Sequence, residues 1–383
     1  MSINEYLEPV SLEKPEGDLP ASKNLFCRHI AIHTADNPIG DLGKYKVAIL
    51  GVPESRASAV DGIHLAPDVI RDKLYQLNFI EKKLPVIDLG NLIRGKEQKD
   101  TYFGLRDVVL ELLQYNILPV IIGGSQDLTY GLFLAFEYLN QAYTLATIDY
   151  RIDLAFESYE KITNKNYLNT ILLENKNLFE YLNIGQQACF AAEENYDLFE
   201  NLFHESIRLG LLRNNIPSIE PYLRDATILS IDFSSLRHSD APGQEFASPN
   251  GFNAEDICQI ARYAGFGEKL KAIGLFDICP LHDHNNVTSS LAAQAIWYLL
   301  EGFSQRIGES PSDHPEEFKK FIISYDETNK LTFFKSLLTN RWWCEVPSNN
   351  SKSRVISCTE SDYINACNRE IPDRWLKILK KLN

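Results

Sequence analysis

Three apolar segments, each ending in polar residues, constrain the fold of this chain more than any other feature. They run from Val120 to Gly131, from Thr147 to Asp153 and from Ala226 to Ser234. Each begins with apolar residues typical of a buried strand and continues into residues that can face a cleft. Open α/β sheets bind their ligands at the carboxyl ends of parallel strands. We therefore expect three strand ends to converge on one site.

Segments of strand type alternate with segments of helical type along much of the chain. Besides the three segments above, we expect strands at residues 46–53, 86–90, 182–187 and 271–280. Apolar residues at helical spacing predict helices at residues 66–74, 102–115, 194–212, 253–264 and 289–303. This alternation predicts an α/β fold, a three-layer α/β/α sandwich with a mostly parallel sheet.

The composition of the chain suggests three parts. Residues 1–43 contain four prolines and mixed charges, which predicts an irregular N-terminal arm that packs over the domain. Residues 44–305 carry the α/β pattern. Residues 306–383 hold three of the four tryptophans, at positions 342, 343 and 375, and are too apolar for a free tail. We expect this C-terminal extension to pack on the domain or on a neighbouring subunit.

Charge and hydropathy exclude several classes of protein. The formal net charge of −14 repels a phosphate backbone, so we expect no nucleic-acid partner. No apolar run approaches the roughly 20 residues that a membrane-spanning helix needs. The N-terminus lacks the basic start and apolar centre of a secretory signal, which favours a cytoplasmic location. The seven cysteines are scattered without a CxxC pair, which predicts free thiols.

Several motifs, found in order between residues 45 and 303, resemble those of the arginase, agmatinase and formimidoylglutamase superfamily, the ureohydrolases. That family carries GGDHS, then DAHxD, then DxD followed by PG. The corresponding residues here are Gly123-Gly124 through Gly131, Asp149 with Asp153, Asp232 with Pro242-Gly243, and Asp277-Ile278-Cys279-Pro280. The resemblance implies an arginase-like fold and a homo-oligomer. It also implies hydrolysis of a linear, non-peptide C–N bond at two manganese ions.

The resemblance implies six metal-ligand positions, and this chain keeps the family's residue at three of them. The six positions are Gln126, Asp149, Arg151, Asp153, Asp232 and Ser234. Gln126 and Arg151 replace histidines, and Ser234 replaces a carboxylate. A guanidinium is always protonated and has no lone pair for a metal. We therefore expect Arg151 to pair with the aspartates in place of a metal ion.

Metal binding is expected to be weak or absent for the same reason. At the first of the family's two metal positions, this chain has three carboxylates and an amide oxygen. These ligands are closer to those of a weak magnesium or calcium site than to those of a manganese site with an imidazole ligand. We expect no cofactor, with a single weakly bound manganese, magnesium or calcium ion as the alternative. Without the resemblance, the three aspartates would more readily be helix caps or loop anchors.

Two further residues are candidates for catalysis. Asp277 stands at the acidic position of the family's ExNP motif but is one methylene shorter than glutamate. His238 follows the Asp232 segment and could act as a base, although a solvated loop histidine is the more ordinary interpretation. The sequence His282-Asp283-His284 resembles a metal site, because two imidazoles flank a carboxylate. In an extended segment its histidines would point away from Asp283, so we expect a surface loop.

These observations leave two hypotheses about function. The first, which we favour on the lost ligands, is a pseudoenzyme: a homologue without the dinuclear manganese site that binds a small molecule or a protein partner. The second is a hydrolase of linear amidines or guanidines, similar to formimidoylglutamase, arginase or agmatinase. Metal content tests the first hypothesis, because the family's chemistry needs a hydroxide activated by two cations and two equivalents of manganese per chain would contradict a pseudoenzyme. The second hypothesis requires one ion or a relocated site, and activity that is lost in Asp232→Ala would support it.

Overall fold

The computed structural model describes residues 3–11, 24–80, 84–155, 160–213, 215–324, 330–349 and 352–383. Its main feature is a ten-stranded sheet with the order β1-β4-β3-β5-β10-β9-β6-β7-β8, in which β2 also pairs with β4. The strands are β1 (Leu7–Glu8), β2 (Ala31–Ile32), β3 (Val47–Val52), β4 (Val86–Leu92), β5 (Leu118–Gly123), β6 (Tyr143–Ile148), β7 (Leu178–Gln186), β8 (Glu205–Arg208), β9 (Ile228–Asp232) and β10 (Ala272–Phe276). All pairings are parallel except that of β1 with β4.

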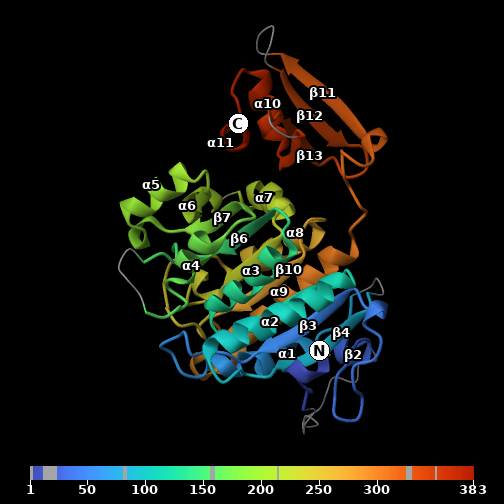
Figure 1. The fold of residues 1–383 in the computed structure, drawn as a ribbon, viewed down its shortest axis with the longest axis vertical. Coiled ribbons are helices and arrows are strands. Elements are labelled where there is room, and N and C mark those ends of the chain that lie inside the picture. Colours follow the sequence, from blue (N-terminus) through green and yellow to red (C-terminus); the bar gives the residue numbers. More distant parts are fainter. Residues whose placement is uncertain are drawn as a thin grey trace.

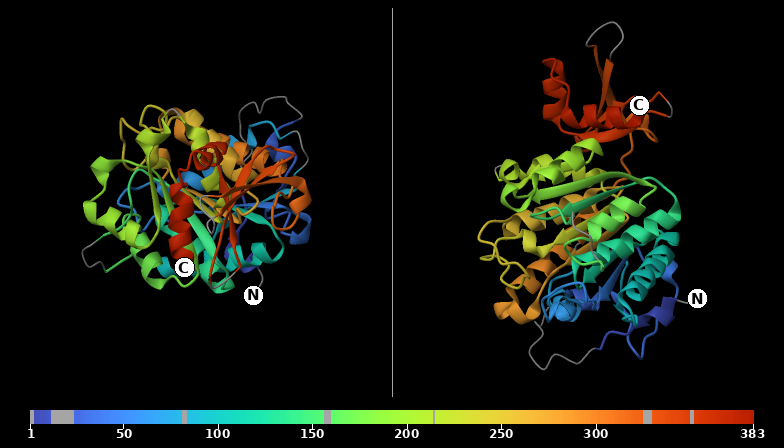
Figure 2. Two further views of the ribbon diagram at one scale, coloured as in Figure 1. Left: turned by 90° about the horizontal axis from the view of Figure 1, so that it is seen from above. Right: turned by 60° about the vertical axis from the view of Figure 1, so that its left-hand side comes forward.

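Helices cover both faces of this sheet, as Figures 1 and 2 show. The helices are α1 (Ala66–Tyr75), α2 (Gln98–Gln114), α3 (Thr129–Leu139), α4 (Tyr167–Glu174), α5 (Glu193–Asn201), α6 (Leu209–Leu212), α7 (Glu220–Asp225), α8 (Ala254–Phe266) and α9 (Val287–Ser304). Successive residues of a strand point to opposite faces. In β3, Val47 and Ile49 pack in the core under α1, α8 and α9, whereas Ala48 and Leu50 pack under α2 and α3. The predicted three-layer α/β/α architecture is confirmed.

Two segments differ from the expected secondary structure. Residues 194–212, expected to be one helix, form α5, the edge strand β8 and the single turn α6. The helical spacing of apolar residues gave a wrong prediction here, because β8 is only four residues long and none of its side chains is fully buried. The segment expected to be irregular at the N-terminus contributes β1 and β2, which pair with β4 at the edge of the sheet.

Residues beyond α9 build a second, four-stranded antiparallel sheet. Its strands are β11 (Phe318–Ser324), β12 (Lys330–Ser336), β13 (Trp342–Val346) and β14 (Arg354–Cys358), followed by α10 (Glu360–Cys367) and α11 (Asp373–Leu382). Trp342 and Trp375 lie in its core. This unit stands at one end of the molecule, beyond β7 and α7, as Figure 1 and the right-hand view of Figure 2 show.

Buried charged groups join this second unit to the main sheet. Arg374 in α11 contacts Glu180 Oε2 at 3.1 Å and Asp225 Oδ2 at 3.0 Å. Asp225 also accepts a hydrogen bond from the Ser357 backbone at 2.9 Å. Arg224 donates to the carbonyl oxygen of Trp342 and lies over the ring of Trp343. The interface therefore depends on paired charges as well as on aromatic packing.

Candidate active site

Four neighbouring parallel strands, in the order β5-β10-β9-β6, end at one edge of the main sheet. Phe276 of β10 lies opposite Asp232, and Ile148 of β6 lies opposite Ile231. Asp149 and Asp277 are the next residues after β6 and β10. The sequence prediction that the three apolar segments converge is therefore correct, and the end of β10 joins them.

A glycine lets the end of β5 approach this edge closely. A Cβ atom at Gly124 would lie 1.7 Å from the carbonyl oxygen of Glu54, which no real side chain tolerates. The carbonyl of Gly124 in turn accepts a hydrogen bond from the backbone of Asp277 at 2.9 Å. Asp277 has a positive φ of 58°, a backbone conformation that non-glycine residues rarely adopt. Its carboxylate is thus held in place by a strained turn.

Asp149 and Asp153 are bridged by the two residues that replace histidines. Arg151 Nε donates to Asp153 Oδ1 at 2.6 Å, and its backbone N–H donates to Asp149 Oδ1 at 3.0 Å. The amide group of Gln126 lies 3.2 Å from Asp149 Oδ2 and 3.0 Å from Asp153 Oδ2. We assign the amide orientation that turns Nε2 toward these oxygens, because only the nitrogen can donate to both carboxylates. Gln126, Asp149 and Asp153 are each exposed by 2% or less. The expected pairing of Arg151 with an aspartate is present.

Asp232 keeps one carboxylate oxygen without a described partner. Its Oδ1 accepts a hydrogen bond from the backbone of Ser234 at 2.6 Å. Its Oδ2 is buried and has no hydrogen-bond partner among the described residues. An unpaired buried acceptor is costly, so such an atom in a native structure calls for an explanation.

Burial raises the pKa values of these carboxyls. It raises the pKa of Asp232 to about 7, and that of Asp149 well above its ordinary value, with the charges of Asp153 and Asp232 adding to the effect. Burial and the charges of Asp232 and Glu245 likewise raise the pKa of Asp277. Burial alone would lower the pKa of Arg151, but Asp153 and Asp149 raise it, so the guanidinium stays charged.

A dinuclear manganese centre does not fit these residues. Arg151 stands at one ligand position, has no lone pair, and already donates to Asp153. Gln126 stands at another, and in the assigned orientation its amide hydrogens are donated to two of the remaining carboxylates. In the described part of the chain, no three or more His, Cys, Asp and Glu side chains are arranged so that they could hold a metal ion. Arg151 and Gln126 serve here as donors to the aspartates.

Aromatic rings cover Arg151 on the outer side. The centres of the Tyr150 and Phe246 rings lie 5.3 and 5.1 Å from its guanidinium carbon. The same Phe246 ring lies 4.1 Å from Lys165 Nζ. The side chain of Arg151 is 15% exposed. Cation–π contacts and the ion pair together fix the guanidinium over the aspartates.

Asp277 is held by a residue that sequence analysis did not single out. Asn164 Nδ2 lies 3.3 and 3.2 Å from the two carboxylate oxygens of Asp277 and 2.6 Å from Glu245 Oε2. Neither Asn164 nor Glu245 lies in a motif that the resemblance covers. Their positions in loops gave no periodic signal from which their role could have been predicted.

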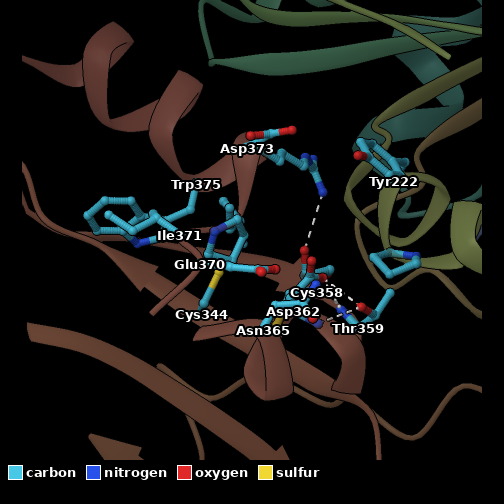
Figure 3. Close-up of a pocket in the computed structure, with 15 residues that line it drawn as sticks. Tyr222, Cys344, Cys358, Thr359, Asp362, Asn365, Glu370, Ile371, Asp373 and Trp375 are labelled. Atoms are coloured by element: carbon cyan, nitrogen blue, oxygen red, sulfur yellow. Dashed lines mark hydrogen bonds between the residues drawn. The ribbon is translucent and has the colours of Figure 1, made fainter. Parts of the chain in front are cut away.

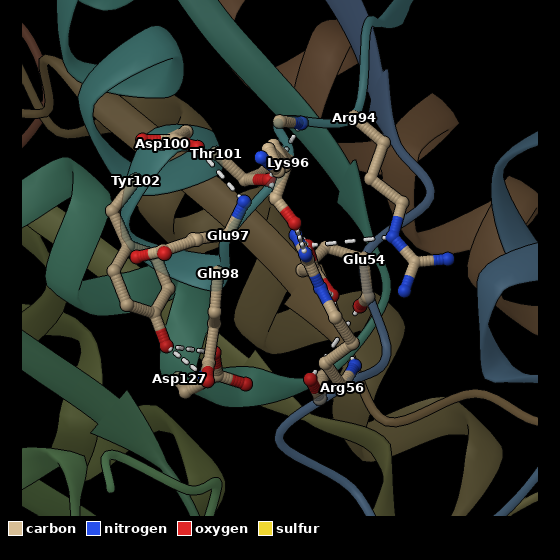
Figure 4. Close-up of polar contacts among 12 residues, drawn as sticks. Glu54, Arg56, Arg94, Lys96, Glu97, Gln98, Asp100, Thr101, Tyr102 and Asp127 are labelled. Atoms are coloured by element: carbon tan, nitrogen blue, oxygen red, sulfur yellow. Dashed lines mark hydrogen bonds and ion pairs between the residues drawn. The ribbon is translucent and has the colours of Figure 1, made fainter.

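Figure 4 shows a second buried carboxylate network, which contains Glu54 and Asp127, and the charge of Asp127 acts on Asp277 of the first network. Glu54 pairs with Arg56 and accepts a hydrogen bond from Thr101 at 3.0 Å. Asp127 accepts hydrogen bonds from Tyr102 and Gln98, and its other oxygen has no described partner. Burial raises the pKa of Asp127 to about 7. Serine at position 125 and aspartate at 127 invert the order in GGDHS, a signal that could have identified Asp127.

The structure does not bring the candidate histidines to this cluster. His238 is exposed, and the described contact at this residue is its backbone N–H to Ser248. His282 and His284 are also exposed, as expected for a surface loop. Asp283 between them accepts hydrogen bonds from the backbone of Thr288 and Ser289 at the start of α9, both at 2.8 Å. This aspartate is a helix cap.

A separate pocket of about 390 Å³ lies between the second unit and the main domain. Figure 3 shows the side chains of Tyr222, Cys344, Cys358, Asp362 and Trp375 around it. None of the aspartates described above lines this pocket. All seven cysteines are free thiols, as predicted. No helix in the described ranges is long and apolar enough to cross a membrane.

Comparisons with known proteins agree with the motifs. The arginase family model matches residues 45–301. Formimidoylglutamase from Streptococcus gordonii is 24% identical over 277 residues, which cover 66% of this chain and 81% of that protein. Formimidoylglutamase from a Geobacillus species is 26% identical over 261 residues, covering 64% of this chain and 78% of that protein.

Solved structures show the same fold at low identity. Formiminoglutamase from Trypanosoma cruzi with manganese superposes with a TM-score of 0.66 and 17% identity, covering 70% of this chain and 97% of that one. Formimidoylglutamase from Bacillus subtilis gives a TM-score of 0.67 and 19% identity, covering 76% and 96%. The family model, which spans more than half of the sequence, shows that this chain belongs to the arginase family.

Proposed function

We propose that the chain is a C–N hydrolase of linear amidines or guanidines, nearest in kind to formimidoylglutamase. The observation that carries this proposal is the retention of Asp149, Asp153 and Asp232, buried at adjoining strand ends, in a chain whose relatives are named formimidoylglutamases. The relatives support this hypothesis better than the pseudoenzyme that the lost ligands first suggested. The site differs from the family's in its use of Arg151 as a fixed cation.

The charge of the site suits a cationic substrate. Asp149, Asp153, Asp232 and Asp277 are all buried, and Arg151 is the guanidinium bonded directly to this group. An amidinium or guanidinium carries N–H donors in one plane that match carboxylate oxygens in pairs. Such a ligand would offset the unpaired carboxylate charge and satisfy the free Oδ2 of Asp232. A neutral amide would offer fewer donors and no charge.

Asp232 is the group best suited to act as a general base. Burial raises its pKa to about 7, close to the value that makes a carboxylate effective near neutral pH. In the proposed step, a water oxygen forms a bond to the amidine carbon while one water proton passes to Asp232. The C–N bond to the leaving amine then breaks, and Asp232 returns the proton to that nitrogen. This route uses only water and residues of this chain.

The test is a turnover assay on the full chain with formimidoylglutamate, agmatine and arginine, with chelator and with added manganese. We expect hydrolysis of formimidoylglutamate that survives chelation and that Asp232→Asn abolishes. Asp313→Asn, which alters an exposed aspartate far from the strand ends, is the matched control. Absence of turnover with every substrate and metal would contradict the proposal.

A second candidate function is ligand binding without hydrolysis. The observation that favours it is the contact between Arg151 and Asp153, which occupies a position that the family uses for catalysis. Under this alternative, calorimetry detects binding of formimidoylglutamate to a chain that releases no product. The same titration distinguishes the two candidates, because hydrolysis adds a continuing heat signal after each injection.

We extend the proposal to the setting in which the chain works. We propose a homo-oligomer in the cytoplasm with a small-molecule substrate, without nucleic acid, membrane or resident cofactor, and with a single weak divalent ion as the cofactor alternative. The acidic composition and net charge of −14 support the exclusion of nucleic acid. Sedimentation at several protein concentrations tests the oligomeric state.

A further inference from the structure

The pocket of about 390 Å³ has walls from both units of the chain. Residues of α10, α11, β13 and β14 line most of it, and Pro221 and Tyr222 of α7 close it from the main domain. Figure 3 shows Tyr222 facing the pocket from the side opposite Trp375. Pockets that bind small organic molecules have volumes of roughly 300–1,000 Å³. This pocket is therefore large enough for a ligand that touches both units.

The start of α11 offers hydrogen-bond donors to an anion. This helix begins at Asp373, after Pro372, and no side chain caps its first turn. The backbone N–H groups of Asp373, Arg374 and Trp375 have no acceptor among the described residues. All three residues line the pocket. Free N–H groups and the helix dipole together favour a negatively charged group at this position.

Arg374 adds a buried donor to the same wall. It is 8% exposed, and two of its guanidinium nitrogens already contact Asp225, Glu180 and the carbonyl oxygen of Ser357. Its Nε has no partner among the described residues. A buried donor without an acceptor costs free energy, so a carboxylate that enters the pocket beside Arg374 would offset part of this cost.

Carboxylates that lack a basic partner also line the pocket. Glu370 lies in the turn before α11 and is exposed, and no described residue bonds to its side chain. Asp362 of α10 accepts hydrogen bonds at Oδ2 from the backbone and the hydroxyl of Thr359, both at 2.7 Å, and no described residue bonds to its Oδ1. Figure 3 shows the carboxylate of Glu370 turned toward the side where Asp362 lies. Such oxygens suit an ammonium group.

Neither a simple anion nor a simple cation fits both sets of groups. Asp362, Glu370 and Asp373 would repel an anion, whereas a cation would leave the N–H groups at the start of α11 without an acceptor. A zwitterion brings a carboxylate to the donors and an ammonium group to the acceptors. The charges of the pocket therefore favour a ligand that carries both.

Apolar side chains form much of the remaining wall. They include Ile356, Ile371 and Trp375, together with Cys344 and Cys358. Both cysteines are buried free thiols, which pack as small apolar side chains. The part of the ligand that carries no charge is therefore expected to be apolar.

We propose that this pocket binds the zwitterion of an aliphatic α-amino acid. Its carboxylate binds the start of α11, its ammonium group binds Glu370 and Asp362, and its side chain packs on Ile356 and Ile371. Because residues of both units line the pocket, the bound amino acid stabilises their docked arrangement. The wall from the main domain is α7, which leads into β9, the strand that ends at Asp232.

Calorimetric titration of the full chain with L-leucine tests the proposal. Two analogues keep the leucine side chain and one charge each: isoamylamine lacks the carboxylate, and isocaproate lacks the amino group. We expect leucine to bind about tenfold more tightly than either, because each analogue loses charge-assisted hydrogen bonds. Equal binding of isoamylamine would reduce the site to a group of carboxylates, and equal binding of isocaproate would reduce it to a helix N-terminus. Either result, or no binding of leucine at millimolar concentration, overturns the proposal.

Glu370→Gln tests the acceptor of the ammonium group. It should weaken leucine binding about fivefold, a modest effect because the carboxylate is exposed. The control is Glu316→Gln, which alters an exposed glutamate that does not line the pocket. This control should bind leucine like the unaltered chain. Equal binding by both variants would contradict the role of Glu370.

Ile371→Trp tests whether leucine binds in this pocket at all. The larger side chain narrows the pocket and should abolish binding, and Ile371 is 36% exposed, so the fold tolerates the change. The control is Ile364→Trp, at a residue of α10 that is 51% exposed and does not line the pocket. Thermal melting and circular dichroism confirm that each variant is folded. Unchanged binding in Ile371→Trp would place leucine elsewhere and contradict the assignment.

Limited proteolysis tests the link between the two units. Leucine should slow cleavage between α9 and β11 in the unaltered chain and in Ile364→Trp, and it should have no effect in Ile371→Trp. Cleavage of the unaltered chain that leucine does not slow would contradict stabilisation of the docked arrangement. None of these measurements uses formimidoylglutamate, so their outcome is independent of whether the chain hydrolyses it.

Discussion

Arg151 Nε lies 2.6 Å from Asp153 Oδ1, and the motif resemblance places both residues at metal-ligand positions of the arginase family. The guanidinium thus supplies positive charge inside a group of buried carboxylates. It is fixed by this ion pair and by the rings of Tyr150 and Phe246. Because this cation is part of the chain, a chelator cannot remove it. We therefore expect the guanidinium to contribute to the stability of the fold.

Arg151→Met should destabilise the chain by about 3 kcal/mol, because breaking a buried ion pair leaves the partner charge uncompensated. Urea unfolding followed by circular dichroism measures this. The control is Arg237→Met, which removes an exposed guanidinium paired with Asp240. It should leave the urea midpoint of unfolding almost unchanged. Equal effects of the two substitutions would show that Arg151 does not compensate the aspartates.

Asp127→Asn should change how stability depends on pH. Burial raises the folded pKa of Asp127 from 3.8 to about 7, so between those values the folded chain binds more protons than the unfolded one. The stability that this group contributes is therefore greatest below about pH 4 and is lost as the pH rises to about 7. Each unit of pKa shift corresponds to about 1.4 kcal/mol.

The variant should therefore be more stable than the unaltered chain at pH 8 and nearly equal to it at pH 4. Unfolding midpoints at the two pH values measure the difference. Asp283→Asn and Asp240→Asn are unsuitable as controls because both carboxylates accept hydrogen bonds from the first turn of a helix, so the exposed Asp313 is altered to Asn instead. A variant that is less stable at pH 8 would mean that the Asp127 charge is compensated by its neighbours.

Arg374→Met should loosen the C-terminal unit from the main domain. Arg374 is 8% exposed and contacts Glu180 and Asp225, each on a separate element of the main domain. Without Arg374, the buried carboxylates of Glu180 and Asp225 lose this ion-pair partner, although Lys269 still pairs with Asp225. We expect a loss of about 3 kcal/mol in stability.

Limited proteolysis measures the same change as faster cleavage between α9 and β11. Lys380→Met alters an exposed residue of α11 and serves as the control. Unchanged cleavage in Arg374→Met would mean that aromatic packing around Trp343 holds the interface without the charged network.

Much of the fold could be predicted because buried parallel strands are continuous apolar runs. The run from Val120 to Ile122 and the one from Ile228 to Ile231 each fall within an observed strand. The edge strand β8 could not be predicted, since its half-buried residues carry no continuous apolar run. The strands of the C-terminal unit were not predicted because their burial depends on packing against α10 and α11.

The sequence predicted only those site residues that occupy positions of the family's motifs. Asp232 ends β9, whereas Asp149 and Asp153 follow β6, and they converge because the register of a parallel sheet fixes the strand ends. Asn164 and Glu245 belong to loops whose course depends on contacts between segments far apart in sequence. His238 follows the Asp232 strand closely, yet the turn at residues 237–240 carries it to the surface, so nearness in sequence was misleading.

The central claim is that Arg151 and Gln126 have replaced the metal chemistry of the family, and metal content tests it most directly. The full chain is incubated with excess manganese, desalted and measured by plasma mass spectrometry, beside the variant Gln126→His, Arg151→His, Ser234→Asp. We predict less than one manganese per unaltered chain, and two per chain in the variant. Two equivalents of manganese in the unaltered chain would contradict the account.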